Sequence, residues 1–287
     1  MNEKNRTEKG VLYLVGTPIG NLSDMSERAV KILSEVDFIA AEDTRNSLRL
    51  LTHLGIKKPM VSYFEHNKQE RGEQIIARLK GGESGALITD AGMPAISDPG
   101  EDLVRLCADE GVTVSTIPGP CAAITALTLS ALPTGRFSFE GFLSANKSER
   151  RAALDELKSE KRTMIFHEAP HKLKATLADM LTAFGGDRKI ALCRELTKLN
   201  EQVLRMTLEG AVSYYEENDP RGEFVLVVEG YAGEDNGKTF WAEMSIPEHV
   251  SYYIGKGMSK NDAVKAAAKD RKVPKNEVYK EALEIKA

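Results

Sequence analysis

Short apolar runs alternate with segments of helical periodicity over the first 117 residues of this chain. Strands are predicted at residues 11–15, 38–41, 59–63, 87–88 and 112–117. Between them, apolar residues recur at helical spacing, as Ala29, Val30, Leu33 and Val36 do. Strands that alternate with helices in this way indicate a parallel sheet covered by helices. The sequence therefore predicts an N-terminal α/β domain, which we place at residues 10–132.

The pattern changes after Leu132. Strand-like runs occur at residues 137–142, 163–167, 190–195, 203–208 and 224–228, with only two or three helical segments between them. This pattern predicts a second, mixed α/β domain at residues 133–230. Residues 231–240 have no hydrophobic periodicity and are predicted to be a linker.

Residues 241–287 predict a small helical appendage. Three short helices are expected at 247–255, 259–271 and 274–285, with Ser259 and Asp262 as a capping pair. Residues 256–286 contain nine Lys or Arg and five Asp or Glu, a local net charge of +4 in a chain of formal net charge −4. A solvated helical face explains this excess, and a surface that faces RNA is the alternative.

Composition narrows the classes of function. A sequence pI near 5.9 argues against a protein that coats nucleic acid without a local basic patch. The three cysteines are far apart and form no CxxC pair, so they predict buried thiols. The polar N-terminus lacks the apolar segment of a signal peptide, and no apolar run reaches the roughly 18 residues of a membrane span. We expect a soluble, cytoplasmic protein with no membrane partner.

Residues 87–100, LITDAGMPAISDPG, lead from a buried strand through a turn rich in Gly and Pro into a helix. Asp98, Pro99 and Glu101 are expected at the N-cap, N1 and N3 positions of that helix, as a capping box. Gly92 lacks a Cβ, which allows the backbone a close approach to a ligand. In α/β sheets ligands bind beyond the carboxyl ends of strands, so this turn predicts a ligand site. A tight turn without a ligand explains the same residues equally well.

Residues 167–171 read His-Glu-Ala-Pro-His and match the HExxH pattern of zinc proteases. A zinc site of that kind needs both histidines one turn apart on a single helix. Pro170 moves Ala169 out of the helical conformation, so His167 is expected at a strand end and Pro170 at the start of the next helix. We therefore predict no metal site here.

Two further polar segments are candidate sites. Glu42, Asp43 and Arg45 follow the strand at 38–41, where they are placed beside the turns of a parallel sheet, although Asp43 also suits a helix cap. Residues 144–151, SANKSERR, form a polar basic segment that predicts either a phosphate-contacting loop or a solvated helix start. The candidate RNA contacts in this segment are Lys147, Arg150 and Arg151.

Seven motifs occur in a fixed order: GTPIGNL, AEDTR, DAGMPAISDPG, IPGPCAAITAL, FHEAPH, CRELTK and GEFVLVVEG. With these motifs the chain resembles the tetrapyrrole methylase superfamily of S-adenosylmethionine enzymes over residues 10–230 and the tail. Within it, the chain is most similar to the ribosomal branch, the bacterial 16S rRNA cytidine 2′-O-ribose methyltransferases. This resemblance implies two α/β domains with S-adenosylmethionine in the cleft between them, and a homodimer.

The resemblance also implies a set of cofactor-binding residues. They are Pro18 in the first loop, Asp90, Ala91, Gly92, Met93 and Ile96 in the central loop, Cys121 and Ala122 after IPGP, and Phe166 and Leu196 in the second domain. Met93 stands where the family pattern leads us to expect threonine, so a hydroxyl contact is not available there.

The implied reaction is methyl transfer to a ribose 2′-hydroxyl of a cytidine in the 16S rRNA of the small ribosomal subunit. A carboxylate near the cleft accepts the hydroxyl proton and an arginine holds the adjoining phosphate. Asp43, Arg45 and Glu168 are the candidate catalytic residues. A tetrapyrrole methyltransferase and a non-catalytic RNA-binding ribosome factor are the alternatives.

Overall fold

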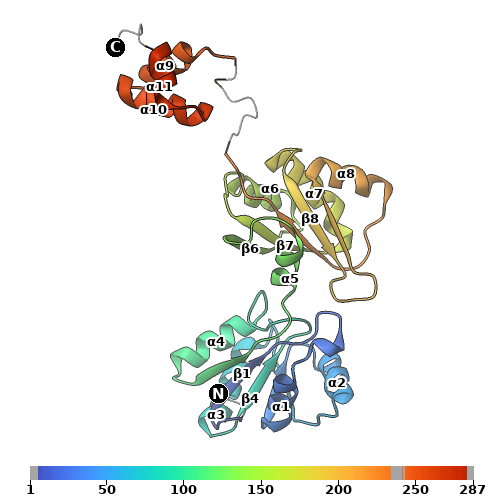
Figure 1. The fold of residues 1–287 in the computed structure, drawn as a ribbon. Coiled ribbons are helices and arrows are strands. Elements are labelled where there is room, and N and C mark those ends of the chain that lie inside the picture. The colour runs from blue at the N-terminus through green and yellow to red at the C-terminus, as the bar shows by residue number, and fades with distance from the viewer. Residues whose placement is uncertain (1–5, 234–240, 242, 283–287) are drawn as a thin grey trace. The chain divides into compact units, whose positions relative to one another are not determined.

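The computed structural model describes residues 6–233, 241 and 243–282. The chain divides into two compact units, Met1–Tyr231 and Ala232–Ala287, and each is described by itself. The first unit contains two five-stranded sheets and the second is helical (Figure 1). The α/β architecture predicted from the sequence is confirmed. No helix among the described residues is long and apolar enough to cross a membrane.

The first sheet is parallel and has the strand order β3-β2-β4-β1-β5. Its strands are β1 (Val11–Val15), β2 (Phe38–Ala41), β3 (Met60–Ser62), β4 (Gly85–Ile88) and β5 (Thr113–Ile117). Its helices are α1 (Glu27–Glu35), α2 (Thr44–His53), α3 (Lys68–Lys80) and α4 (Gly100–Asp109), with a 3₁₀ turn at Leu22–Asp24. Hydrophobic clusters cover both faces of this sheet, which explains why its central strands are apolar at nearly every position.

The second sheet is mixed and has the order β6-β7-β10-β8-β9. Its strands are β6 (Phe137–Phe142), β7 (Thr163–Glu168), β8 (Lys189–Arg194), β9 (Gln202–Thr207) and β10 (Phe224–Val228). The helices α6 (Lys147–Glu156), α7 (Pro170–Phe184) and α8 (Leu208–Glu217) contribute to the hydrophobic cluster on one face. Helix α5 (Ala122–Leu129) packs on the other face, at the junction of the two sheets (Figure 1).

Alternation along β7 decides which side chains face α5. Met164 and Phe166 belong to the cluster under α6, α7 and α8, whereas Ile165 belongs to the cluster with α5. Successive residues of a strand point to opposite faces, so His167 lies on the same face as Ile165. This face of the second sheet therefore forms one wall of the space beside α5.

The prediction of a capping box at the start of α4 (Gly100–Asp109) is wrong. The helix begins at Gly100 after Pro99, and the side chain of Glu101 pairs with Arg105. The Asp98 carboxylate instead accepts hydrogen bonds from the backbone N–H of Gly100 at 2.7 Å and of Ala95 at 3.1 Å. Asp98 therefore fixes the turn that precedes the helix.

The described part of the second unit contains α9 (Ile246–Gly255), α10 (Lys260–Arg271) and α11 (Lys275–Glu281) around a small apolar core. The three helices predicted there are confirmed, although residues 283–285 of the third prediction lie outside the described residues. Ser259 caps α10 by accepting from the Asp262 N–H. Helices α10 and α11 are joined by a turn of three residues, 272–274, and Lys272, Lys275 and Lys280 are exposed.

Candidate functional site

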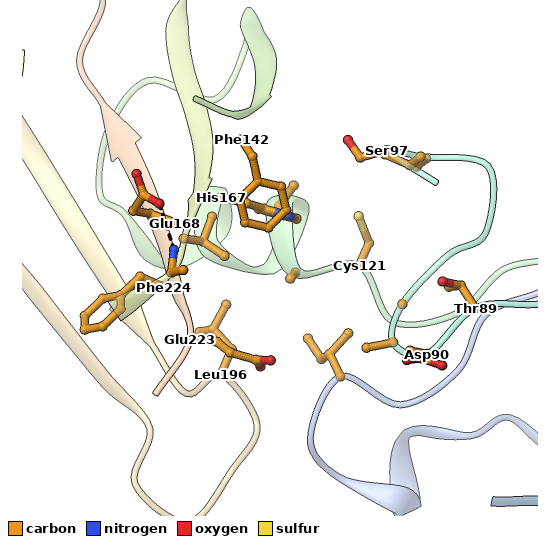
Figure 2. A pocket seen from close by; sticks show the side chains of 18 of the residues that line it. Thr89, Asp90, Ser97, Cys121, Phe142, His167, Glu168, Leu196, Glu223 and Phe224 are labelled. Atoms are coloured by element: carbon orange, nitrogen blue, oxygen red, sulfur yellow. Dashed lines mark hydrogen bonds between the residues drawn. The ribbon is translucent and has the colours of Figure 1, made fainter. Parts of the chain in front are cut away.

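A pocket of about 590 Å³ lies in the first unit. It is lined by the loops that follow β1, β2 and β4, the start of α5, and the facing side of the second sheet with the HEAPH segment (Figure 2). Its volume is in the range of sites that enclose a small organic ligand. The pocket therefore brings together segments from both α/β halves of the chain, and the central turn at 87–100 forms part of its lining.

The loops after β1 and β4 are joined by a short antiparallel bridge. Thr17 N–H donates to Gly92 O at 2.9 Å, and Gly92 N–H donates to Thr17 O at 3.1 Å. Gly92 has a φ of 87°, which favours glycine. A Cβ built on it would meet its neighbours at an ordinary 3.5 Å. Backbone conformation, more than close approach, therefore explains the glycine at this position.

The central loop is strained beyond Gly92. Ala95 and Ser97 both have positive φ values, 68° and 61°. Such values are uncommon for residues with a side chain, and they persist only where the surroundings hold them. Asp98 supplies that restraint through the backbone hydrogen bonds described above. These hydrogen bonds restrain the part of the loop that lines the pocket.

Sequence reasoning missed a close crossing of two glycines beneath this loop. A Cβ on Gly16 would lie 2.9 Å from Cα of Gly119, and 2.7 Å from Sδ of Met93. Any side chain at Gly16 would therefore displace the backbone of the IPGP segment and move the Met93 side chain. The sequence signal was the glycine in both GTPIG and IPGP. These two turns follow strands β1 and β5, which are neighbours in the sheet, so their glycines could be expected to lie close together.

On the second sheet, the chain after β8 presents Leu196 to the pocket. Glu195 and Thr197, on either side of it, have φ values of 52° and 64°. Leu196 itself is buried and packs in the cluster with α5. Two strained residues thus hold one apolar side chain in the lining, opposite the central loop.

The charge of the lining favours a cation. It contains the carboxylates of Glu42, Asp90, Asp98, Glu168 and Glu223, and none of the described lining residues is Lys or Arg. Desolvation and the neighbouring Asp90 charge raise the pKa of Glu42, and desolvation raises the pKa of Asp98 despite its backbone hydrogen bonds. A bound positive charge would relieve this repulsion.

These features fit S-adenosylmethionine, which carries a sulfonium and an ammonium group on an otherwise apolar nucleoside and side chain. The acidic edge at Glu42 and Asp90 suits the cationic part, while Ile96, Cys121 and Leu196 offer apolar surface to the rest. When bound, the cofactor supplies an electrophilic methyl group.

Eight of the predicted cofactor residues line this pocket. They are Asp90, Ala91, Gly92, Met93, Ile96, Cys121, Ala122 and Leu196. Pro18 is outside the lining, although its neighbour Ile19 is part of it. Phe166 is fully buried in the cluster on the opposite face of the second sheet, so its expected contact with the cofactor is corrected. His167, the next residue along β7, lines the pocket in its place.

Asp43 and Arg45 are paired with one another outside the described lining. Asp43 accepts from the Arg45 backbone N–H at 2.8 Å and caps α2, and its other oxygen lies 2.9 Å from Arg45 Nη2. Hydrogen bonds from Arg45 lower the pKa of Asp43 to about 2, which makes it a poor proton acceptor. The preceding residue, Glu42, is the acidic group of this segment that faces the pocket.

Glu168 lies at the pocket, and both of its carboxylate oxygens accept hydrogen bonds within the fold. Oε2 accepts from the Thr176 hydroxyl at 2.5 Å and Oε1 accepts from the Ala169 N–H at 2.8 Å. The side chain is 1% exposed. These contacts tie the end of β7 to α7, so the structure gives Glu168 a structural role.

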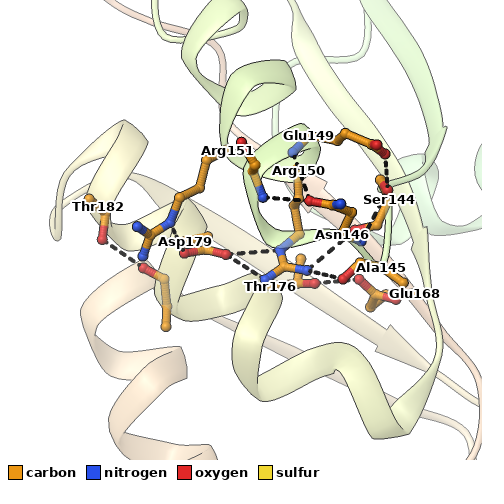
Figure 3. Close-up of polar contacts among 12 residues, drawn as sticks. Ser144, Ala145, Asn146, Glu149, Arg150, Arg151, Glu168, Thr176, Asp179 and Thr182 are labelled. Atoms are coloured by element: carbon orange, nitrogen blue, oxygen red, sulfur yellow. Dashed lines mark hydrogen bonds and ion pairs between the residues drawn. The ribbon is translucent and has the colours of Figure 1, made fainter.

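The basic segment before α6 is largely a helix start. Asn146 caps α6, and Arg150 is buried and forms hydrogen bonds to Asp179 at 2.6 and 2.9 Å (Figure 3). The expectation that Arg150 contacts RNA is therefore corrected, because its guanidinium is used inside the fold. Arg151 also contacts Asp179 but is half exposed, and Lys147 is exposed.

The HEAPH segment takes the conformation expected from Pro170. His167 is in β7 and Pro170 begins α7, which places the two histidines on different elements. Both histidines line the pocket, a shared location that the sequence pattern did not reveal. Among the residues that the structure describes, no three His, Cys, Asp or Glu are grouped as a metal site would require.

Comparison with known proteins identifies relatives of this chain. Residues 11–212 match the family model described as Tetrapyrrole (Corrin/Porphyrin) Methylases. Proteins named ribosomal RNA small subunit methyltransferase I are similar over nearly the whole chain. The protein of Halalkalibacterium halodurans is 50% identical over 277 residues, 96% of each chain, and that of Bacillus subtilis is 47% identical over 281 residues, 97% of this chain and 96% of its own.

Two solved structures show the same fold. The uroporphyrin-III-C-methyltransferase of Thermus thermophilus has a TM-score of 0.54 and 20% identity, and covers 77% of this chain and 94% of its own. A cobalt precorrin-4 methyltransferase has a TM-score of 0.57 and 16% identity, and covers 77% of this chain and 95% of its own. The chain therefore belongs to the tetrapyrrole methylase family of S-adenosylmethionine-dependent methyltransferases.

Proposed function

We propose that this enzyme methylates the ribose 2′-hydroxyl of a cytidine in 16S ribosomal RNA of the small ribosomal subunit. The observation that carries the proposal is the near full-length similarity, at 47–50% identity, to relatives named ribosomal RNA small subunit methyltransferase I. The choice of a cytidine and of its 2′-oxygen rests on the resemblance to the ribosomal branch of the family. Tetrapyrrole methylation, the activity named in the two solved structures, is the alternative.

The charge of the pocket supports separate binding surfaces for the cofactor and for the RNA backbone. An acidic lining without Lys or Arg among its described residues suits the cationic cofactor and disfavours phosphate groups. The RNA backbone would therefore stay outside, and a ribose edge would enter. Methyl transfer is an in-line displacement, so positioning of the hydroxyl supplies much of the rate enhancement.

Basic groups outside the pocket are the proposed phosphate contacts. Arg45 is 87% exposed and is fixed by Asp43 close to the loop that carries Glu42. Lys147, Arg151 and the exposed lysines of the helical unit add positive charge in a protein of net charge −4. We retain Arg45 as the group that holds an RNA phosphate, and we assign Asp43 to the orientation of Arg45.

The proposal places the enzyme in the cytoplasm, where ribosomal subunits mature, and includes the homodimer implied by the resemblance. Light scattering on the purified protein tests the dimer.

The substrate is tested by incubating the enzyme and labelled S-adenosylmethionine with small subunits from a strain that lacks this protein. Large subunits and a tetrapyrrole precursor serve as parallel substrates.

Label that enters 16S rRNA of the deletion-strain subunits, and stays absent from wild-type subunits, supports the proposal. Label on the tetrapyrrole alone would replace it with the alternative. Cofactor binding without transfer to any of these substrates would contradict it.

A further inference from the structure

His167 is held at the pocket by aromatic neighbours. Its ring lies 5.2 Å from that of Phe139 and 5.3 Å from that of Phe142, edge to face in both cases. In the sheet it is paired with Phe142 of β6 and Val225 of β10. Figure 2 shows the imidazole against Phe142, on the side of the pocket opposite Thr89 and Asp90. The ring is therefore well fixed in position.

One nitrogen of this ring is left without a partner. Nε2 of His167 is buried and has no hydrogen-bond partner among the described residues. Buried polar atoms in native proteins nearly always have a partner, and an exception at a ligand pocket points to a group supplied by the ligand. Among the described residues of the lining, His167 alone has a buried side-chain nitrogen or oxygen in this state.

The carboxylates of the lining differ from His167 in this respect. Glu168 is occupied by Thr176 and Ala169, and Asp98 is occupied by backbone N–H groups of its own loop. Glu42 accepts a hydrogen bond from the Thr89 hydroxyl at 3.3 Å, and Glu223 lies 2.8 Å from Lys198 Nζ. Asp90 accepts from the Asn46 amide at 3.2 Å, so each carboxylate of the described lining has at least one partner, whereas Nε2 of His167 has none.

The surroundings also favour the neutral form of this imidazole. Desolvation by burial lowers the pKa of His167, and the charge of Glu223 opposes that effect without reversing it. The rings of Phe139 and Phe142, both from β6, lie beside the imidazole, and the other titratable groups of the lining are Glu42, Asp90, Asp98, Glu168, His171 and the two cysteines. A neutral imidazole with its proton on Nδ1 presents a lone pair at Nε2.

We propose that Nε2 of His167 accepts the hydrogen bond, and then the proton, of the ribose 2′-hydroxyl as that oxygen is methylated. The inference rests on the proposed function and assigns its proton acceptor. In this step the ribose oxygen forms the new O–CH₃ bond while the S–CH₃ bond breaks, and that bonding pair remains on sulfur. The hydroxyl proton passes to Nε2, and the resulting imidazolium is stabilised by the carboxylates of the lining.

The test compares two substitutions in the full-length enzyme. His167→Phe keeps an aromatic ring between Phe139 and Phe142 and removes both nitrogens, whereas His167→Gln keeps hydrogen bonding without basicity. His53→Gln, in the exposed last turn of α2 and outside the lining, is the control. Melting curves and calorimetry with S-adenosylmethionine establish that each variant folds and binds the cofactor. Single-turnover transfer to deletion-strain small subunits gives the rate.

Both His167 variants are expected to bind the cofactor within about threefold of wild type and to lose roughly 10²- to 10⁴-fold in the single-turnover rate. The wild-type rate should fall as the pH is lowered from about 8 to about 5, because protonation removes the lone pair, and the control should follow the same curve. Any residual rate of His167→Gln should lack this fall.

Three results would overturn the inference. They are a wild-type rate that is constant over this pH range, a near wild-type rate in either His167 variant, and loss of cofactor binding that accounts for the whole loss of rate. The pH profile of the wild-type enzyme can be measured even if a His167 variant fails to fold. Failure of the proposed function itself would look different, since wild-type enzyme would then transfer no methyl group to the small subunit.

Discussion

Thr17 and Gly92 exchange two backbone hydrogen bonds and so join the loop after β1 to the loop after β4. The Thr17 side chain adds a hydrogen bond to the carbonyl of Thr89, at 3.0 Å, and is itself fully buried. This edge of the pocket is thus built on backbone pairing between two loops. Its shape depends on the positive φ of Gly92.

Gly92→Ala should weaken cofactor binding about tenfold. An L-residue at positive φ costs about 1–2 kcal/mol, which the loop relieves by moving out of register with Thr17. Gly82→Ala is the matched control, because Gly82 has a φ of 90° with nothing near its Cβ and lies outside the pocket lining. Calorimetry should show wild-type affinity for the control. Equal affinities in the two variants would mean that the bridge does not shape the site.

Replacement of Glu42 by Gln should remove a pH dependence of cofactor binding. Desolvation and the Asp90 charge raise the pKa of Glu42, so it begins to take up a proton at a higher pH than an ordinary glutamate. A bound cation favours the ionised form. Affinity should therefore be greatest at neutral pH and fall as the pH drops towards this raised pKa.

S-adenosylhomocysteine, which lacks the sulfonium charge, separates the charge effect from changes in shape. Its affinity should depend less on pH than that of S-adenosylmethionine in the wild-type enzyme. Titration calorimetry of both ligands, in both proteins, gives the comparison. A Glu42→Gln protein with the wild-type pH profile would exclude Glu42 as the responsible group.

Substitution of Arg150 should destabilise the fold and leave intrinsic RNA affinity unchanged. Arg150 and Asp179 are 7% and 5% exposed, and removal of one partner from a buried ion pair costs about 3–5 kcal/mol. We expect Arg150→Met to lower the free energy of unfolding by this order, as measured by urea denaturation. Arg151→Gln, whose side chain is half exposed, should cost only about 0–1 kcal/mol.

The same pair predicts a loss of stability in acid. Burial alone would raise the pKa of Asp179, but the guanidiniums of Arg151 and Arg150 hold it below its ordinary value. The stabilisation is therefore complete above the unfolded-state pKa and is lost as the pH falls through the lower, folded-state pKa. Asp179→Asn should lose this acid-dependent contribution. An unchanged pH dependence of unfolding in Asp179→Asn would contradict it.

The basic helical unit should contribute to RNA binding through charge. Replacement of Lys272, Lys275 and Lys280 by Gln should flatten the plot of log affinity against log salt by about 0.7 for each single-strand phosphate contact that is lost. Replacement of the same three by Arg keeps the charge and should keep the slope. Filter binding over a salt series measures both. A wild-type slope in the Gln variant would leave this surface as a solvated helical face.

The sequence predicted the fold well because its strands are buried and apolar, and because Gly and Pro mark the turns between them. Strands β1, β2, β6 and β10 have the predicted limits. The central loop and Leu196 were also predicted, through motifs that keep their spacing. Strand limits and turn positions depend mainly on neighbouring residues, so they can be predicted from local sequence.

Two residue predictions, for Arg150 and Phe166, were wrong because they depended on tertiary contacts that a sequence pattern does not contain. Arg150 looked like a phosphate ligand until Asp179, 29 residues away, was found beside it. Phe166 and His167 exchange roles because strand alternation, set by the packing of α7 and α5 on opposite faces, decides which one faces the pocket. Glu42 and Asp43 are a different case, because the sequence already offered Asp43 as a helix cap. The cap takes the Asp43 carboxylate, and Glu42 lines the pocket.

The central claim is that the methyl group goes to a ribose oxygen of a cytidine in 16S rRNA. It is tested most directly by mass spectrometry of nucleosides from deletion-strain small subunits that have been treated with enzyme and isotopically labelled S-adenosylmethionine. The account predicts labelled cytidine that fragments into an unlabelled base and a labelled ribose, with none from untreated subunits. Label that stays with a base, or that appears in another nucleoside alone, would contradict it.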